Sequence, residues 1–213
     1  MKKTIIILCT LFLSASAIAQ DQKVKLGIKA GLNLAMLTLD KSELDSSSKA
    51  GFTAGVMVEI PMTKKFSLQP EIMYSQQGTK TSFSDSDVTN SNYESTIKLN
   101  YLNIPVMLKY YVIEGLSVQA GPQIGILLKA NNKYKDNFLG YDNQESFDLK
   151  EYSSGIDTSV NVGLGYQFKD KFYTDLRYNI SYSNVFKDGE TNHFIDNDMK
   201  NRVLQITIGY FFK

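Results

Sequence analysis

Apolar and polar residues alternate with a period of two along most of the chain that follows residue 22. In residues 23–34, Val24, Leu26 and Ile28 alternate with lysines and glycine. Successive side chains of a β-strand point to opposite faces, so this pattern predicts strands with one apolar and one polar face. It recurs in eight segments, which are 23–34, 50–60, 66–75, 101–110, 116–128, 156–168, 172–182 and 203–212. The sequence therefore predicts an all-β fold of eight strands.

The connections between these segments alternate in length. Short turns are expected at 61–65, 111–115 and 169–171, and long polar loops at 36–49, 77–96, 130–152 and 184–201. Transmembrane barrels have short turns on the periplasmic side and longer loops outside. The segment lengths therefore favour an antiparallel up-and-down transmembrane β-barrel. After residue 20, no run of 18 apolar residues predicts a membrane-spanning helix.

Two kinds of barrel could carry this alternation. A soluble, lipocalin-like barrel would bury the apolar face, whereas a membrane barrel would turn that face to lipid. An eight-stranded barrel has little interior space, which favours the smaller polar residues inside. Aromatic residues also gather at the short-turn ends of the apolar face, as in the girdles of membrane barrels. These residues are Phe66, Tyr110, Phe168, Phe172, Tyr210 and Phe212, with Tyr74 and Tyr182 toward the loop ends. The membrane orientation is therefore preferred.

Three prolines fall inside predicted strands. Pro70, Pro105 and Pro122 each lack the N–H group that a strand contributes to its ladder. A closed barrel offers no free edge for them, so we expect β-bulges or tilted strand ends at these positions.

The first 19 residues resemble a secretory signal peptide. Lys2 and Lys3 precede an apolar run, and Ala17-Ile18-Ala19 fits the small-x-small rule for cleavage. The run is too short to span a bilayer. Cys9, the only cysteine, lies within it, so residues 20–213 are expected to form one barrel domain that has neither a disulfide nor a thiolate metal site. Its 21 basic and 22 acidic residues give no support for nucleic-acid binding.

Several segments resemble the PorT-like, or porin-family, outer-membrane β-barrel domain of Bacteroidetes-type bacteria. They are residues 27–33, 67–78, 101–110, 120–125, 175–178 and 205–212, in this order and at this spacing. The resemblance implies a cell outer membrane location, with outer-membrane lipid and the barrel insertion machinery as partners. It implies no single activity. Phe212 is penultimate, whereas many such barrels end on an aromatic residue.

Seven charged residues lie on the polar face of the predicted strands. If this face turns inward, the charges share a narrow lumen, where unpaired charge is costly and pairing is expected. Glu71 and Lys109 lie on neighbouring predicted strands, and Asp175 and Arg177 lie two residues apart. A structural plug of ion pairs is preferred to an ion or proton path, because eight strands leave little room for water. The set is Lys29, Glu59, Glu71, Lys109, Asp157, Asp175 and Arg177.

The four long loops are acidic, with 15 acidic and eight basic residues. Acidic clusters could bind a divalent cation through oxygen ligands, but their spacing matches no EF-hand loop. A solvated acidic rim is therefore the preferred interpretation, and no metal or cofactor is predicted. The two clusters are Asp85 with Asp87, and Asp136, Asp142, Glu145, Asp148 and Glu151.

His193 is the only histidine, and Asp188, Glu190, Asp196 and Asp198 lie near it in the sequence. This grouping allows an alternative in which the loop end carries a lipid-modifying enzyme or a protease. A histidine alone in a loop is more often simply exposed. We therefore predict a non-enzymatic envelope or surface protein, which could form a narrow pore or bind a surface ligand or protein partner through its loops. A soluble periplasmic barrel is the third alternative.

Overall fold

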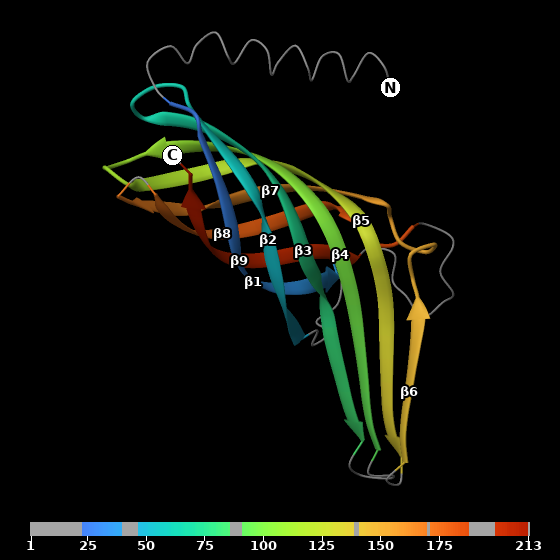
Figure 1. Ribbon diagram of the computed structural model, residues 1–213. Coiled ribbons are helices and arrows are strands. Elements are labelled where there is room, and N and C mark those ends of the chain that lie inside the picture. Colours follow the sequence, from blue (N-terminus) through green and yellow to red (C-terminus); the bar gives the residue numbers. More distant parts are fainter. Residues whose placement is uncertain are drawn as a thin grey trace.

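The computed structural model describes residues 23–39, 47–85, 91–138, 141–169, 171–187 and 199–212, which form nine β-strands (Figure 1). The predicted signal peptide and His193 lie outside these residues. The strands are β1 (Lys25–Leu39), β2 (Ser47–Pro61), β3 (Phe66–Asp85), β4 (Ser91–Tyr111), β5 (Leu116–Phe138), β6 (Tyr141–Asp148), β7 (Ile156–Phe168), β8 (Phe172–Asn184) and β9 (Met199–Phe211).

Eight of these strands close into a barrel. Strand β1 pairs with both β2 and β9, and the remaining pairs, including β4 with β5 and β5 with β7, complete the circuit. Every pairing is antiparallel, as the predicted up-and-down barrel requires. Among the described residues, the one remaining strand, β6, pairs only with the outer part of β5. The eight-stranded all-β fold is therefore confirmed. No helix among the described residues is long and apolar enough to cross a membrane.

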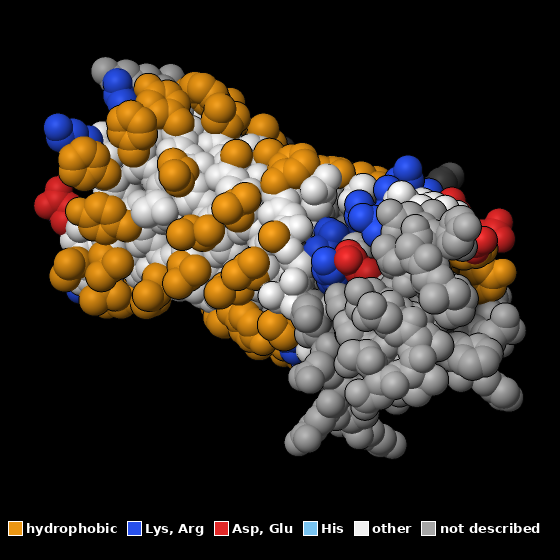
Figure 2. Space-filling view, turned by 90° about the horizontal axis from the view of Figure 1, so that it is seen from below, with side chains coloured by type: hydrophobic (Ala, Val, Ile, Leu, Met, Phe, Trp, Pro, Cys, Tyr) orange, Lys and Arg blue, Asp and Glu red, His pale blue; other side chains and the backbone are white. Residues whose placement is uncertain are grey.

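The apolar face of the strands points outward and the polar face inward. Ile208 is 69% exposed on the outer wall, whereas Arg177 is 2% exposed inside. Figure 2 shows hydrophobic side chains spread over the wall on the face in view, with charged side chains toward its two ends. This arrangement suits a wall that faces hydrocarbon and a narrow interior filled by polar side chains. It is opposite to that of a soluble lipocalin-like barrel.

Aromatic residues mark the short-turn end of the wall, as predicted. The rings of Phe66 and Tyr110 lie 5.0 Å apart across the β3–β4 pair. On the other side of the barrel, Phe172 contacts Tyr210 with a centroid distance of 5.5 Å, and Tyr210 contacts Phe212 at 5.9 Å. These pairs form an aromatic belt at the level expected for a membrane interface.

The prediction of loops at 77–96 and 130–152 is wrong for most of these residues, which form strands. Strands β3 and β4 continue as a regular ladder from the Gln77–Leu99 pair to the Asp85–Ser91 pair, and β5 continues outward to pair with β6. Figure 1 shows the outer parts of β3, β4 and β5, together with β6, extending far beyond the barrel. A strand beyond the membrane has water on both faces, so it loses the apolar alternation on which the prediction depended.

The prolines sit in the barrel without the bulges predicted for them. Near Pro70, Pro105 and Pro122 the ladders skip two pairs, but the register is the same on both sides of each gap. The register shifts lie elsewhere, as between Asn100 and Tyr101 in β4. A missing N–H therefore interrupts the pairing locally without inserting an extra residue.

Candidate functional site in the barrel interior

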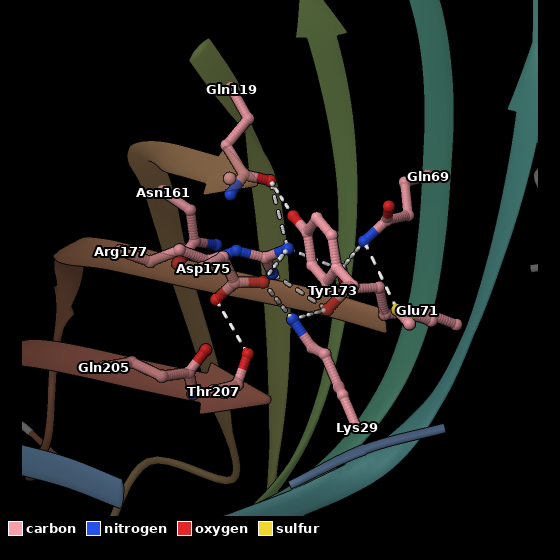
Figure 3. A network of polar contacts seen from close by, with 12 residues as sticks. Lys29, Gln69, Glu71, Gln119, Asn161, Tyr173, Asp175, Arg177, Gln205 and Thr207 are labelled. Carbon is pink, nitrogen blue, oxygen red and sulfur yellow. Dashed lines mark hydrogen bonds and ion pairs between the residues drawn. The ribbon is translucent and has the colours of Figure 1, made fainter. Parts of the chain in front are cut away.

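Four charged side chains from three strands meet in the middle of the lumen (Figure 3). Arg177 of β8 donates from Nη1 and Nη2 to the two carboxylate oxygens of Glu71 of β3, at 2.8 and 2.6 Å. The Nζ of Lys29 lies 2.9 Å from Glu71 Oε2 and 3.0 Å from Asp175 Oδ2. Arg177 also lies 3.1 Å from Asp175, whose other oxygen accepts from Thr207 Oγ1 at 2.9 Å. These four ionic residues, here called the central cluster, have two positive and two negative charges.

A second ion pair lies between the central cluster and the short turns. Lys109 donates to Glu59 Oε2 at 2.9 Å and to Gln69 Oε1 at 3.0 Å. The other oxygen of Glu59 accepts from the hydroxyl of Tyr111 at 2.5 Å. Gln69 then donates from Nε2 to Glu71 at 2.6 Å, which links the pair to the central cluster. Each of these six charged groups thus lies against an opposite charge, as buried ions require.

Apolar and aromatic side chains fill the space beside these charges. The ring of Tyr173 lies 4.4 Å from Lys109 Nζ, within the range of a cation–π contact. Tyr173 also packs against Phe211 and Met57, both of which are buried in the same cluster. In the sequence, these three residues alternate in phase with the polar residues of their strands. This phase is the sequence feature that predicts their inward position.

Asp157 does not belong to the ion-pair network. It accepts hydrogen bonds from the hydroxyls of Ser181 and of Ser183, the latter at 2.6 Å. The described residues provide no ion pair for it. The pairing of Glu71 with Lys109, suggested by their neighbouring strands, is likewise replaced: Glu71 binds Lys29 and Arg177, and Lys109 binds Glu59. Six of the seven predicted residues therefore meet in two linked groups.

An apolar layer lies in the lumen on the side of the long loops. It combines residues of three strands with Leu149, Val185 and Phe186 from the segments that follow β6 and β8. These segments are held together by backbone hydrogen bonds from Ser154 to Val185 and from Lys187 to Tyr152. The complete buried set is Leu37, Leu99, Tyr101, Leu127, Ala130, Leu149, Val185 and Phe186, here called the outer apolar layer.

The register shift at Tyr101 explains why one member of this layer, Ala130, was not predicted to face inward. Tyr101 pairs with Leu127, whereas the preceding Asn100 pairs with Lys129, so Leu128 is an extra residue in β5. The inward face of β5 therefore changes from odd to even positions, and both Leu127 and Ala130 are buried. Strict alternation cannot reveal such a change of phase.

The candidate loop sites are only partly covered by the structure. His193 and its acidic neighbours lie outside the described residues, as does Asp87. Among the acids of the third predicted loop, Glu145, Asp148 and Glu151 are exposed. Within the described part of the chain, no group of three or more His, Cys, Asp or Glu residues is placed to hold a metal ion.

The sequence pattern of the outer membrane protein beta-barrel domain matches residues 18–187. The chain belongs to this family. It is accordingly a protein of the cell outer membrane, and the outward apolar band and aromatic belt are its contacts with lipid. None of the curated proteins matches it.

Several solved bacterial structures align with most of this chain at low sequence identity. Ail of Yersinia pestis, in a complex with the heparin analogue sucrose octasulfate, is 16% identical with a TM-score of 0.48, over 90% of this chain and 100% of that one. Neisserial surface protein A is 13% identical with a TM-score of 0.47, over 90% and 100%. OprG of Pseudomonas aeruginosa is 10% identical with a TM-score of 0.39, over 92% and 99%.

Proposed function

We propose that this outer-membrane barrel is a non-enzymatic surface protein that binds an extended segment of a partner protein at the edge of its projecting sheet. The interior favours a support over a pore, because the central cluster and the outer apolar layer both lie across the lumen. The resemblance to PorT-like domains is consistent with such a role and assigns no chemistry to it.

The observation that carries the proposal is the free edge of β6. Strand β6 is the last strand in the order of the sheet, and it pairs through all eight residues with β5. Among the described residues, nothing pairs with its other side. An ordered edge strand presents a row of backbone donors and acceptors that a partner strand can use.

The register identifies which backbone groups are available. Leu149, which follows β6, donates from its N–H to Ala130 of β5 at 3.0 Å. Because hydrogen-bonded and non-hydrogen-bonded pairs alternate in an antiparallel ladder, the N–H groups of Gln144 and Ser146 point away from β5. A partner strand would bind these groups.

The side chains of β6 suggest the chemistry of the partner. Glu145 and Asp148 are exposed and acidic, which favours lysine or arginine in the added strand. Phe147 is also exposed, and its ring lies 6.0 Å from that of Tyr134 on β5. These two rings would accept an aromatic or aliphatic residue on the same face. A basic segment with alternating apolar residues is therefore the expected ligand.

Replacing Ser146 by proline tests the proposal. The substitution removes an outward N–H but leaves the β5–β6 hydrogen bonds in place, and edge strands tolerate proline at such positions. Selection of eight-residue peptides on the purified protein in detergent should give basic, alternating sequences. The Ser146→Pro variant should bind them at least about tenfold more weakly, equivalent to about 1.4 kcal/mol, whereas Ser146→Ala should bind normally. Selected peptides that bind Ser146→Pro as well as the parent protein would contradict strand addition.

A further inference from the structure

A pocket of about 650 Å³ opens at the short-turn end of the barrel, opposite the projecting sheet. This volume lies within the usual range for sites that bind small molecules. Four separate segments form it: the residues that precede β1, and the turns between β2 and β3, β4 and β5, and β7 and β8. Short turns face the periplasm in outer-membrane barrels, so the pocket opens toward the periplasm.

The pocket has a strongly basic lining. Five lysines line it, together with two acidic residues, Glu59 and Glu114. The charge of Glu59 is already balanced, because its oxygens accept from Lys109 and from Tyr111. Among the described residues of the lining, the lysines therefore outnumber the acidic residues. The five lysines are Lys23, Lys25, Lys64, Lys65 and Lys169.

A buried amide provides a second, independent indication of a ligand. Gln167 lines the pocket and is 8% exposed, and its backbone is fixed by a hydrogen bond from its N–H to Gly115 O at 2.8 Å. Its side-chain Oε1 lies 3.3 Å from the Tyr111 hydroxyl, which donates its proton to Glu59 at 2.5 Å. The Nε2 group, however, has no hydrogen-bond partner among the described residues. A buried donor without a partner is costly unless something accepts from it.

Part of the remaining wall is apolar. Val112 and Ile113 of the β4–β5 turn line the pocket and are well exposed, and Pro61 lies in the lining beside them. This lining fits a small ligand with several anionic oxygens, which the lysines and the Gln167 amide would bind. The apolar part of the wall would contact a compact carbon framework or a bridging atom of the same ligand.

We propose that this pocket, here called the periplasmic pocket, binds a small periplasmic anion that carries at least two negative charges on carboxylate or phosphate groups. The lysines attract and hold the anionic oxygens, and Gln167 Nε2 donates to one of them. Two sources share this chemistry: a soluble metabolite, or the headgroup of an anionic phospholipid from the inner leaflet. The site is separate from the β6 edge, so either proposal can fail without the other.

Calorimetric titration with pyrophosphate and with citrate tests the periplasmic pocket. The full-length protein is placed in nanodiscs of phosphatidylcholine at about 20 mM salt, where screening of exposed charges is weak. The test variant combines Lys64→Gln, Lys65→Gln and Lys169→Asn, since asparagine tolerates the positive φ of Lys169. A control variant removes three lysines from the opposite end: Lys129→Gln, Lys133→Gln and Lys150→Gln.

The test variant should bind either anion at least about tenfold more weakly, and the control variant should bind within about twofold of the parent protein. Gln167→Leu, which keeps the volume and all five lysines, should also weaken binding. Adding cardiolipin, whose headgroup carries two phosphates, to the nanodiscs separates the sources: competition with pyrophosphate indicates a lipid headgroup, and unchanged binding indicates a soluble anion. The proposal is overturned if neither anion binds, or if the test and control variants lose affinity equally.

Discussion

Arg177 and Glu71 form a two-point ion pair across the lumen, with both carboxylate oxygens of Glu71 held by the guanidinium group at 2.6 and 2.8 Å. The two residues lie 106 positions apart in the sequence. Their strands, β3 and β8, face each other across the barrel. Lys29 binds the same carboxylate, so Glu71 balances two cations inside an interior that excludes most water. Glu71, Arg177 and Lys29 therefore connect β3, β8 and β1 at the centre of the barrel.

Replacing Glu71 by glutamine should strongly destabilise the barrel. The change leaves Lys29 and Arg177 with only Asp175 as a counter-charge, and breaking a buried ion pair from one side costs about 3–5 kcal/mol. Glu94 is the matched control, because it pairs with Lys80 at 2.8 Å outside the membrane and about a third of its side chain is exposed. Glu94→Gln should cost no more than about 1 kcal/mol. Urea unfolding in detergent micelles measures both, and equal effects would contradict a structural role for the central cluster.

The side-chain pattern was sufficient to predict the barrel and its orientation, whereas the pairing inside it was not predictable. Each strand carries its own alternation, so eight strands and two faces can be read from local sequence. Which inward residues meet depends on strand tilt and stagger around the closed barrel. Lys109 illustrates this: it pairs with Ser67 of β3 but reaches across that strand to bind Glu59 of β2.

An arginine on the outer wall tests the lipid-facing orientation. Val162 lies in the middle of β7 and is exposed on the wall, and Phe168 ends the same strand at the aromatic belt. Val162→Arg should cost about 2–4 kcal/mol of unfolding free energy, and Phe168→Arg about 0–1 kcal/mol, because the penalty falls with distance from the bilayer midplane. Unfolding in lipid vesicles measures the difference. A wall exposed to water would show no such dependence on depth.

Gly31 allows β1 and β9 to approach closely. A Cβ atom added at this position would collide with the backbone of Ile206 and Thr207, which cannot move without breaking the ladder. Gly31→Ala should therefore cost about 1–3 kcal/mol, as other overpacked sites do. Gly155 is the control glycine, because nothing lies near a Cβ built there. Gly155→Ala should be nearly neutral, and the gel shift on heating in detergent would rank the two variants.

Phe186 should contribute more to stability than its place beside a loop suggests. It is 1% exposed in the outer apolar layer, and truncating a buried phenylalanine to alanine costs about 3–5 kcal/mol. Tyr152, on the adjoining segment, is exposed, so Tyr152→Ala should change the unfolding free energy by less than about 0.5 kcal/mol. Limited proteolysis of intact protein should also cut the Phe186→Ala variant faster near residues 149–155. Equal cleavage of both variants would show that the layer does not hold these segments.

The purified protein should not conduct ions across a planar bilayer. Two independent barriers lie across the lumen: the central cluster, where four charged side chains bind one another, and the outer apolar layer, which no ion crosses easily. Phe186→Ala should therefore remain closed, because it weakens only the second barrier. Stepwise current from the parent protein would contradict this account of the interior. Current from Phe186→Ala alone would show that the apolar layer is the main barrier, and that ions can pass the paired charges of Lys29, Glu71, Asp175 and Arg177.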